Sequence, residues 1–282
     1  MALRINYNFE SVSAQRNLAA NQGVFQRAIE QLSSGMRINK AADDAAGLAV
    51  SEKLRNQVRG LNQAQRNAQD SVSLLQTAEG ALNETHSLLS RMRELAVQSA
   101  NDTLTNADRL HIQDEVNQLL SEVDRIAAST QFNTIALLNG TGGASLKFHV
   151  GANVETGDFA NELSFSLGDA STAGLSIANL SAAQSLTTQS TSNAAISVLD
   201  TAIENISSRR GAIGAMQNRL ASTINSLGVA AENTGAANSR IRDADTAQAV
   251  SEMTRAQILQ QSTMAVLAQA NQAPQMALQL LK

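Results

Sequence analysis

Apolar residues recur at every seventh position over two long stretches of this 282-residue chain. The first column consists of Leu54, Leu61, Ala68, Leu75, Leu82, Leu89 and Ala96, and the second of Leu199, Ile206, Ile213, Leu220 and Leu227. A sustained spacing of seven makes a continuous apolar stripe on a long helix, and other helices must cover that stripe. The pattern therefore predicts long helices near 44–100 and 193–233 that pack together as the core of an antiparallel rod.

Both ends of the chain carry narrower stripes with the same spacing, which predict further helices over about 4–38 and 246–281. These stripes are interrupted by polar residues and are too weakly apolar for either helix to be stable alone. We therefore predict that both ends are disordered or frayed in the monomer and become ordered by packing against neighbouring copies of the protein. The residues predicted to mediate this polymerisation are Leu18, Phe25, Leu32, Leu259, Val266, Leu267 and Leu280.

The spacing of apolar residues changes in the middle of the chain. Thr105 and Asp108 have the spacing of a capping box, and they precede a shorter predicted helix that ends near Ser129. Apolar and polar residues then alternate within 144–168, which predicts a small β-hairpin, and the Ser-, Thr-, Ala- and Gly-rich segment 168–192 predicts a surface loop. The predicted fold class is mainly α: a long antiparallel helical rod with terminal coiled-coil helices and one small β-hairpin region.

The composition favours thin helix–helix seams over a thick globular core. Only 2% of the residues are aromatic, and Pro274 is the single proline, so very long helices are permitted. The net charge of −4 argues against a nucleic-acid partner, because phosphate binding requires a basic surface. No stretch approaches a membrane span or a secretory leader. We expect no membrane insertion, and either a cytoplasmic protein or export without a cleaved leader.

The sequence lacks recognisable catalytic chemistry. His86, His111 and His149 are far apart along the chain, no cysteine is present, and no zinc, phosphate-loop or nucleophile motif occurs. The adjacent Asp43 and Asp44 are interpreted as the acidic N-terminal turn of the helix that follows them. We therefore expect no enzymatic activity, no metal and no cofactor.

Several segments, in the right order, resemble the signatures of bacterial flagellins. Residues 32–48 read LSSGMRINKAADDAAGL, and the likeness continues through RNAQD (66–70), QTAEGAL (76–82), RELAVQ (93–98), TQFN (130–133), LLNG (137–140), GAMQNRL (214–220), SRIRDAD (239–245) and AQANQ (268–272). Hook–filament junction proteins share the terminal helices but tend to carry proline in the segment equivalent to 43–48, which here reads DDAAGL. Thr246 replaces an aromatic residue that many flagellins have, and the middle of the chain is too short for outer variable domains.

The resemblance implies a division of labour along the chain. Residues 1–43 and 244–282 would form the coiled-coil domain that lines the inner tube of a flagellar filament, and residues 44–243 the helical rod with its hairpin. The family's subunits are exported unfolded through the flagellar type III apparatus into the extracellular filament. Their usual partners are copies of themselves, an export chaperone, a cap protein and hook-associated proteins.

The resemblance also implies a second role, recognition by the animal Toll-like receptor for flagellin. The matching residues are Arg91, Leu95 and Gln98, together with Glu115 on the next helix, while Ser90 replaces a glutamine of strongly sensed flagellins. A contact between filament subunits would equally account for the presence of these residues. From the periodicity alone, a cytosolic coiled-coil adaptor is a third alternative, which predicts a folded dimer with ordered termini.

Overall fold

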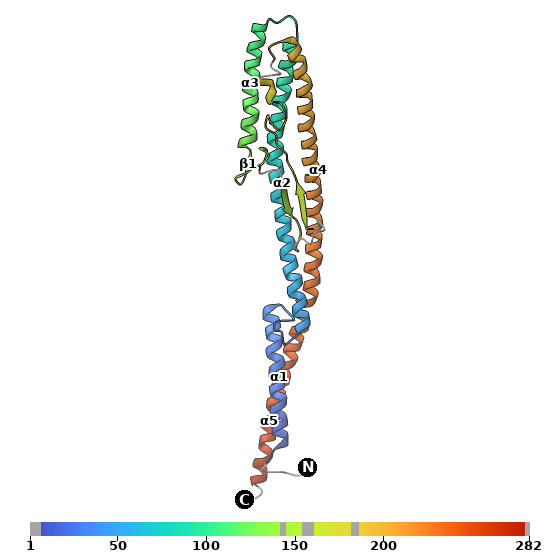
Figure 1. The fold of residues 1–282 in the computed structure, drawn as a ribbon. Helices are drawn as coiled ribbons and strands as arrows, with labels where there is room; N and C mark the ends of the chain where they lie inside the picture. The colour runs from blue at the N-terminus through green and yellow to red at the C-terminus, as the bar shows by residue number, and fades with distance from the viewer. Residues whose placement is uncertain (1–6, 142–144, 154–160, 182–185, 280–282) are drawn as a thin grey trace. The chain divides into compact units, whose positions relative to one another are not determined.

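The computed structural model describes residues 7–141, 145–153, 161–181 and 186–279, the last seven of these as backbone only (Figure 1). The described chain is mainly α-helical, as the sequence predicts. Its elements are α1 (Phe9–Ser34), α2 (Ala45–Ser99), α3 (Asn106–Ser129), β1 (Gln131–Phe132), β2 (Ile135–Ala136), β3 (Leu146–His149), β4 (Glu162–Phe165), the 3₁₀-helix η1 (Ala178–Ser181), α4 (Gln189–Arg242) and α5 (Thr246–Gln279).

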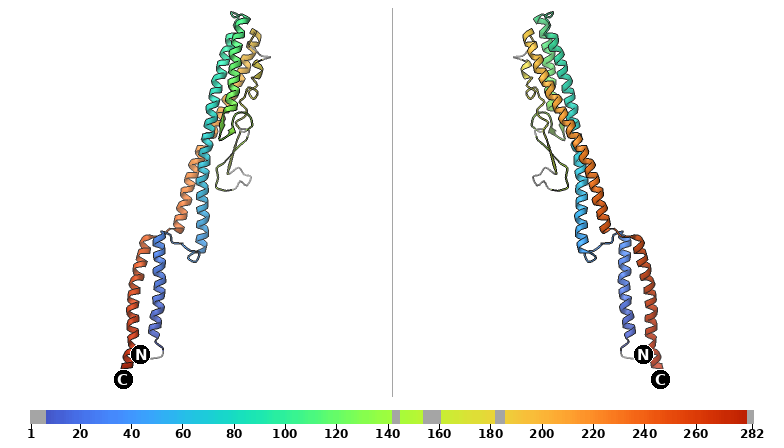
Figure 2. Two further views of the ribbon diagram at one scale, coloured as in Figure 1. Left: turned by 90° about the vertical axis from the view of Figure 1, so that its left-hand side faces the viewer. Right: turned by 90° about the vertical axis from the view of Figure 1, so that its right-hand side faces the viewer.

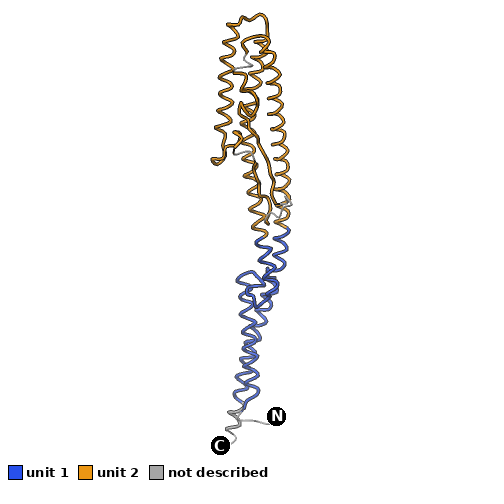
Figure 3. The backbone as a smooth tube through the Cα atoms, viewed as in Figure 1, with its two compact units in different colours: residues 1–56, 233–282 blue, residues 57–232 orange. Residues whose placement is uncertain are grey.

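The chain divides into two compact units (Figure 3). Unit 1 comprises residues 1–56 and 233–282, and unit 2 comprises residues 57–232. Unit 1 therefore joins the two ends of the chain, with α1 and α5 as its main elements.

Most helix boundaries agree with the sequence pattern, and two differ for local reasons. α1 ends at Gly35, whose φ of 69° is a left-handed C-cap that glycine adopts without strain. α4 begins earlier than predicted because Thr188 and Thr191 bond reciprocally through their hydroxyls and backbone N–H groups, which caps its first turn. It also continues to Arg242, because no proline interrupts the weakly periodic residues after 233.

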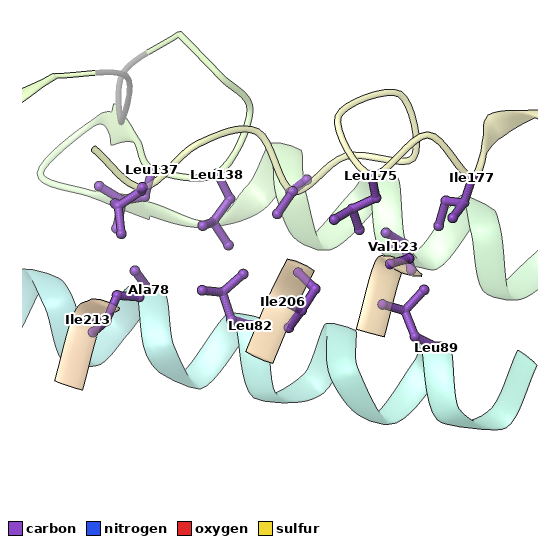
Figure 4. Close-up of a cluster of buried hydrophobic side chains, with 14 of the residues drawn as sticks. Ala78, Leu82, Leu89, Val123, Leu137, Leu138, Leu175, Ile177, Ile206 and Ile213 are labelled. Carbon is purple, nitrogen blue, oxygen red and sulfur yellow. The ribbon is translucent and has the colours of Figure 1, made fainter. Parts of the chain in front are cut away.

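The two strong columns form the core of unit 2, as predicted. The column residues from Leu61 to Ala96 on α2 and from Leu199 to Leu227 on α4 are all buried. α3 adds Val116, Val123 and Ala127 to the same cluster. Figure 4 shows Ala78, Leu82 and Leu89 of α2 close to Ile206 and Ile213 of α4, with Val123 of α3 beside them.

The segment after α3 is not the surface loop that we predicted for 168–192. Its backbone runs alongside the long helices of unit 2 (Figure 2). Figure 4 shows Leu137, Leu138 and Leu175 turned toward those helices. The buried apolar residues of the segment are Leu137, Leu138, Leu167, Ala170, Leu175, Ile177, Leu180 and Leu186. Because these residues are irregularly spaced, no periodic pattern marks them as core. Residues 182–185 lie outside the described part of the chain.

Side chains from the long helices hold this segment through its backbone. The Asp124 carboxylate of α3 accepts hydrogen bonds from the Thr172 N–H at 2.8 Å and from the Thr172 hydroxyl at 2.9 Å. Gln113 donates from Nε2 to the Leu180 carbonyl at 3.0 Å and accepts from the Leu186 N–H at 2.6 Å. These bonds satisfy backbone groups that would otherwise be buried without partners.

Two short antiparallel hairpins lie within this region. The predicted one is β3–β4, in which Leu146 pairs with Phe165 and His149 with Glu162. The pair β1–β2 was not predicted: it is only two residues long, and its turn residues Asn133 and Thr134 have φ values of 47° and 66°, without the glycine that usually signals such a turn.

The turn between α2 and α3 is closed by polar groups. The buried guanidinium of Arg109 donates to the carbonyls of Ser99 at 2.9 Å and Asn101 at 3.0 Å, at the C-terminus of α2. A cation at this end of a helix is favoured by the helix dipole. The predicted capping box is present, because Thr105 and Asp108 each accept from the other's backbone N–H at the start of α3.

In unit 1, α1 and α5 lie side by side and run antiparallel (Figure 2). The residues buried between them are small: Ala14 and Ala28 on α1, and Ala249, Ala256 and Ala270 on α5. Asn21 donates to the Thr263 hydroxyl at 3.4 Å across the seam. Nearer the N-terminal end of α1, Asn8 donates to the Ala270 carbonyl at 2.8 Å and the Ser11 hydroxyl donates to Asn271 at 2.9 Å. The terminal helices therefore pair along an alanine-rich seam that polar contacts also cross.

The linkers that leave these helices are joined to each other. The Arg37 N–H donates to the Arg242 carbonyl at 2.6 Å, and the Ala244 N–H donates to the Gly35 carbonyl at 2.9 Å. The half-buried Arg242 guanidinium also contacts Glu52 at 2.5 Å. The two adjacent aspartates were predicted to form the first turn of α2, but both precede that helix. Asp44 caps it by accepting from the Gly47 N–H at 2.8 Å. Asp43 instead accepts from the N–H groups of Asn39 at 3.1 Å and Lys40 at 2.9 Å in the preceding turn.

Candidate assembly surface

The α1–α5 seam uses only part of the predicted polymerisation residues. Leu18, Phe25, Leu32 and Leu267 are half-buried beside the seam alanines, whereas Leu259 and Val266 face outward. Val266 remains 55% exposed. Leu280 lies outside the described residues. The structure therefore brings four of these residues to the contact within one chain and leaves two at the surface.

Unit 1 carries most of the exposed large apolar side chains. Among the described residues, eleven of the fifteen such side chains belong to it. They are Tyr7, Phe9, Val12, Val24, Ile29, Val50, Val250, Ile258, Leu259, Met264 and Val266, and we call this set the assembly face. Most of them lie outside the seven-residue columns, and of this set only Leu259 and Val266 were predicted to mediate polymerisation.

A groove of about 700 Å³ lies between α1 and α5 near the N-terminal end of α1. Its apolar lining residues are Phe9, Ala14, Val266 and Ala270. Its polar lining includes the hydroxyl groups of serine and threonine residues and the side-chain amide of Asn17. Among the described residues that line the groove, Glu10 is the one with a charged side chain.

Charge is sparse along α5. From Ala256 to Gln279 the helix contains no Asp, Glu, Lys or Arg. Another chain can therefore pack against this length without desolvating a charge, which would be costly. The charged groups of unit 1 lie elsewhere: Lys40 pairs with Glu30 at 2.7 Å, and this hydrogen bond raises the pKa of Lys40. That pair is exposed, so it contributes little to stability.

The predicted receptor residues lie in unit 2, and three of the four are exposed. The Arg91 guanidinium of α2 donates to Glu115 of α3 at 2.9 and 3.0 Å, and to Glu94 at 3.2 Å. These bonds, above all those that Arg91 donates to Glu115, raise the pKa of Arg91. Leu95 is only 2% exposed and belongs to the core, while Gln98 is exposed. Glu94 stands three residues after Arg91 on α2, so helical spacing alone is enough to bring these two side chains together.

The described segments contain neither a cluster suited to a metal ion nor a helix suited to a membrane span. No group of three or more His, Asp or Glu side chains there is placed to hold a metal ion. None of the helices described is both long and apolar enough to cross a lipid bilayer.

Paired heptad helices with a surplus of exposed apolar side chains are typical of a subunit that packs against other proteins. Residues 5–142 match the bacterial flagellin N-terminal helical region, and residues 196–281 match the bacterial flagellin C-terminal helical region. The chain belongs to the bacterial flagellin family, and it is a structural subunit of the flagellar filament.

Individual relatives agree over nearly the whole length. The chain is 50% identical to a flagellin of Halalkalibacterium halodurans over 278 residues, which is 99% of each chain. It is 46% identical to the flagellar filament 30.7 kDa core protein of Treponema maltophilum, covering 98% of this chain and 99% of the relative. A solved flagellar hook-associated protein of Vibrio parahaemolyticus shares the fold, with a TM-score of 0.57 and 16% identity over 71% of this chain and all of that one.

Proposed function

We propose that this flagellin polymerises through the assembly face of unit 1. The observation that carries the proposal is the concentration of exposed apolar side chains on helices whose own seam is already filled by alanines. Fully burying a Val, Leu, Ile or Phe side chain gains about 1.5–3 kcal/mol. If each contact between subunits buries several of these side chains, which the α1–α5 seam leaves exposed, their burial favours polymerisation.

The family's division of labour extends this proposal to domains. Residues 1–43 and 244–282 would line the inner tube, and residues 44–243 would form the outer helical rod. Both boundaries fall near breaks between helices, since α1 ends at Ser34, α2 begins at Ala45, and α5 begins at Thr246. The alanine seam lets α1 and α5 approach closely, which suits a narrow wall of paired helices.

We also propose that the subunit is secreted unfolded through the flagellar export apparatus and assembles outside the cell. A large exposed apolar surface is an aggregation liability for a free subunit. An export chaperone that covers this surface, a cap protein that folds arriving subunits, and hook-associated proteins at the filament ends are the partners this route requires.

The polymerisation proposal is tested by comparing two exposed valines. Val266 in unit 1 is 55% exposed and Val229 in unit 2 is 59% exposed, so Val266→Asp and Val229→Asp make the same chemical change at similar accessibility. We expect both monomers to keep the wild-type circular dichroism and unfolding midpoint. Val266→Asp should raise the critical concentration for filament growth by about tenfold or more, since about 1.4 kcal/mol corresponds to tenfold. Normal filaments of Val266→Asp by electron microscopy would refute the proposal.

A second proposed function is recognition by the animal Toll-like receptor for flagellin. It is favoured by the exposed ion-pair cluster in which Arg91 joins α2 to Glu115 of α3, with Gln98 exposed on α2. The buried Leu95 would support this surface from the core. Arg91→Ala monomer should lose activity in a receptor reporter assay. Arg93→Ala is the matched control, because Arg93 is also an exposed α2 arginine in an ion pair, with Asp200. Equal responses from both variants would contradict the assignment.

A further inference from the structure

Two buried serines extend the seven-residue columns of unit 2 beyond their apolar part. Ser192 stands seven residues before Leu199 on α4, and it is fully buried. Ser99, the last residue of α2, is fully buried as well. It ends a second buried column on α2, whose members are also seven residues apart: Ser71, Ala78, Thr85, Met92 and Ser99.

These two serines, which we call the serine layer, bond to each other across the seam between α2 and α4. The Ser192 hydroxyl donates to the Ser99 hydroxyl at 2.9 Å, and it also lies 2.8 Å from the Thr188 carbonyl. The Ser99 hydroxyl donates to the Leu186 carbonyl at 2.7 Å. Because a buried hydroxyl without a partner is costly, the layer is stable only where these groups meet.

The other buried hydroxyls of the second column do not cross the seam. The Ser71 hydroxyl donates to the Asn67 carbonyl at 2.7 Å, and the Thr85 hydroxyl donates to the Ala81 carbonyl at 3.1 Å. Both bonds stay within α2, so they form wherever α4 lies along it. Ser99 differs because its side-chain partners belong to other elements.

Three polar contacts join α2 to α4 and show that the two helices run antiparallel. Besides the serine layer they are the Arg93–Asp200 ion pair and, farther along, the hydrogen bond from Gln217 to Glu79 at 3.0 Å. The ion pair is exposed and contributes little to stability. Of the three contacts, only the serine layer is fully buried.

The apolar columns alone permit more than one alignment of these helices. A shift by seven residues, about 10 Å along the axis, still places apolar column residues against each other. The same shift separates the two serines. Ser99 then faces Leu199, or, when the shift is in the opposite direction, Ser192 faces Met92.

We infer that the serine layer sets the register of α2 against α4. A single polar layer in an otherwise apolar heptad seam favours one alignment, because every other alignment leaves its polar groups without partners. The layer is therefore a specificity element, and the apolar columns supply the stability.

A fixed register matters for a subunit of the flagellar filament, because a helical polymer repeats the same contacts between all its copies. A subunit shifted by about 10 Å would present the surfaces of α2 and α4 in a different relative position. The serine layer itself is a property of the folded monomer, so its test does not depend on how subunits contact each other.

The test is disulfide trapping in the full-length monomer, since the chain has no cysteine of its own. Arg93→Cys combined with Asp200→Cys reports the observed register. Arg93→Cys combined with Ser207→Cys reports the shifted register, because Ser207 is exposed on α4 seven residues after Asp200. The rate of disulfide formation under mild oxidation is measured for each pair.

In the Ser99→Ala/Ser192→Ala background, we expect the shifted pair to form its disulfide about tenfold faster or more, because that alignment no longer leaves hydroxyls unpaired. The pair in the observed register should keep its rate within about 2-fold, since replacing both partners of a hydrogen bond is nearly neutral. An unchanged rate for the shifted pair overturns the inference.

Two controls separate a change of register from general loosening. Ser71→Ala is the matched variant, because it removes a buried serine hydroxyl that bonds only within α2. It should leave the rate of the shifted pair unchanged. Arg93→Cys combined with Ser226→Cys, 26 positions beyond Asp200, can form a disulfide only when the helices separate. Equal acceleration by Ser71→Ala, or equal acceleration of the Ser226 pair by loss of the serine layer, would also overturn the inference.

Discussion

Replacing Asp124 with alanine should loosen the segment that covers the core of unit 2. Both carboxylate oxygens of Asp124 accept hydrogen bonds from Thr172. Thr172 is only 8% exposed, so water can hardly replace Asp124 as the acceptor. Asp124→Ala leaves the Thr172 N–H without its acceptor. Removing a charged acceptor from a buried donor costs about 1.5–3 kcal/mol, a range that includes the penalty of leaving the donor unsatisfied.

A matched control removes the effect of helix propensity. Alanine is favoured over aspartate inside a helix by about 0.5 kcal/mol, so part of the loss at Asp124 is hidden by this gain. Asp114 is an exposed aspartate on the same helix α3. Asp114→Ala should therefore stabilise slightly, and the difference between the two variants should be about 2–3 kcal/mol.

The assay is urea unfolding of the monomer followed by circular dichroism, combined with amide exchange over residues 170–178. In a unit of this size, a loss of 2 kcal/mol corresponds to a fall in Tm of about 4–8 °C. Exchange should accelerate in 170–178 before it does so in α2. Equal unfolding midpoints for Asp124→Ala and Asp114→Ala would refute the reasoning, because the bonds to Thr172 would then contribute nothing.

Three further changes probe the core, a turn and a cap. Leu82→Ala removes a fully buried side chain and should lower the free energy of unfolding by about 3–5 kcal/mol, as measured in urea. Gly140→Ala should cost about 1–2 kcal/mol by the same measurement, because Gly140 has a φ of 76° and an added Cβ would lie 3.1 Å from Asp169. Hydrogen bonds from the Thr105 hydroxyl and N–H lower the pKa of Asp108 from its ordinary 3.8, so this stabilisation is complete above that value and is lost as the pH falls through the lowered pKa. Acid titration of Thr105→Ala should show a shallower loss of stability than the wild type, and an identical profile would contradict the assignment.

The sequence by itself determined the long helices and the main core. The spacing of seven on α2 and α4 identified the buried column from Leu61 to Ala96 and its partner from Leu199 to Leu227, because helical periodicity is a local property that depends only on residue order. The capping box at Thr105 and the hairpin β3–β4 were predicted for the same reason. The flagellin resemblance was likewise carried by contiguous segments.

Only the tertiary structure decided which surfaces are used within one chain and which remain exposed. Leu267 and Val266 are neighbours in the same apolar pattern, yet α1 half-buries the first and leaves the second exposed. Thr172 bonds to Asp124, which lies 48 positions away along the chain, and Asn8 bonds to Ala270, which lies 262 positions away. Such contacts depend on the relative position of elements that are distant along the chain, so no local pattern can encode them.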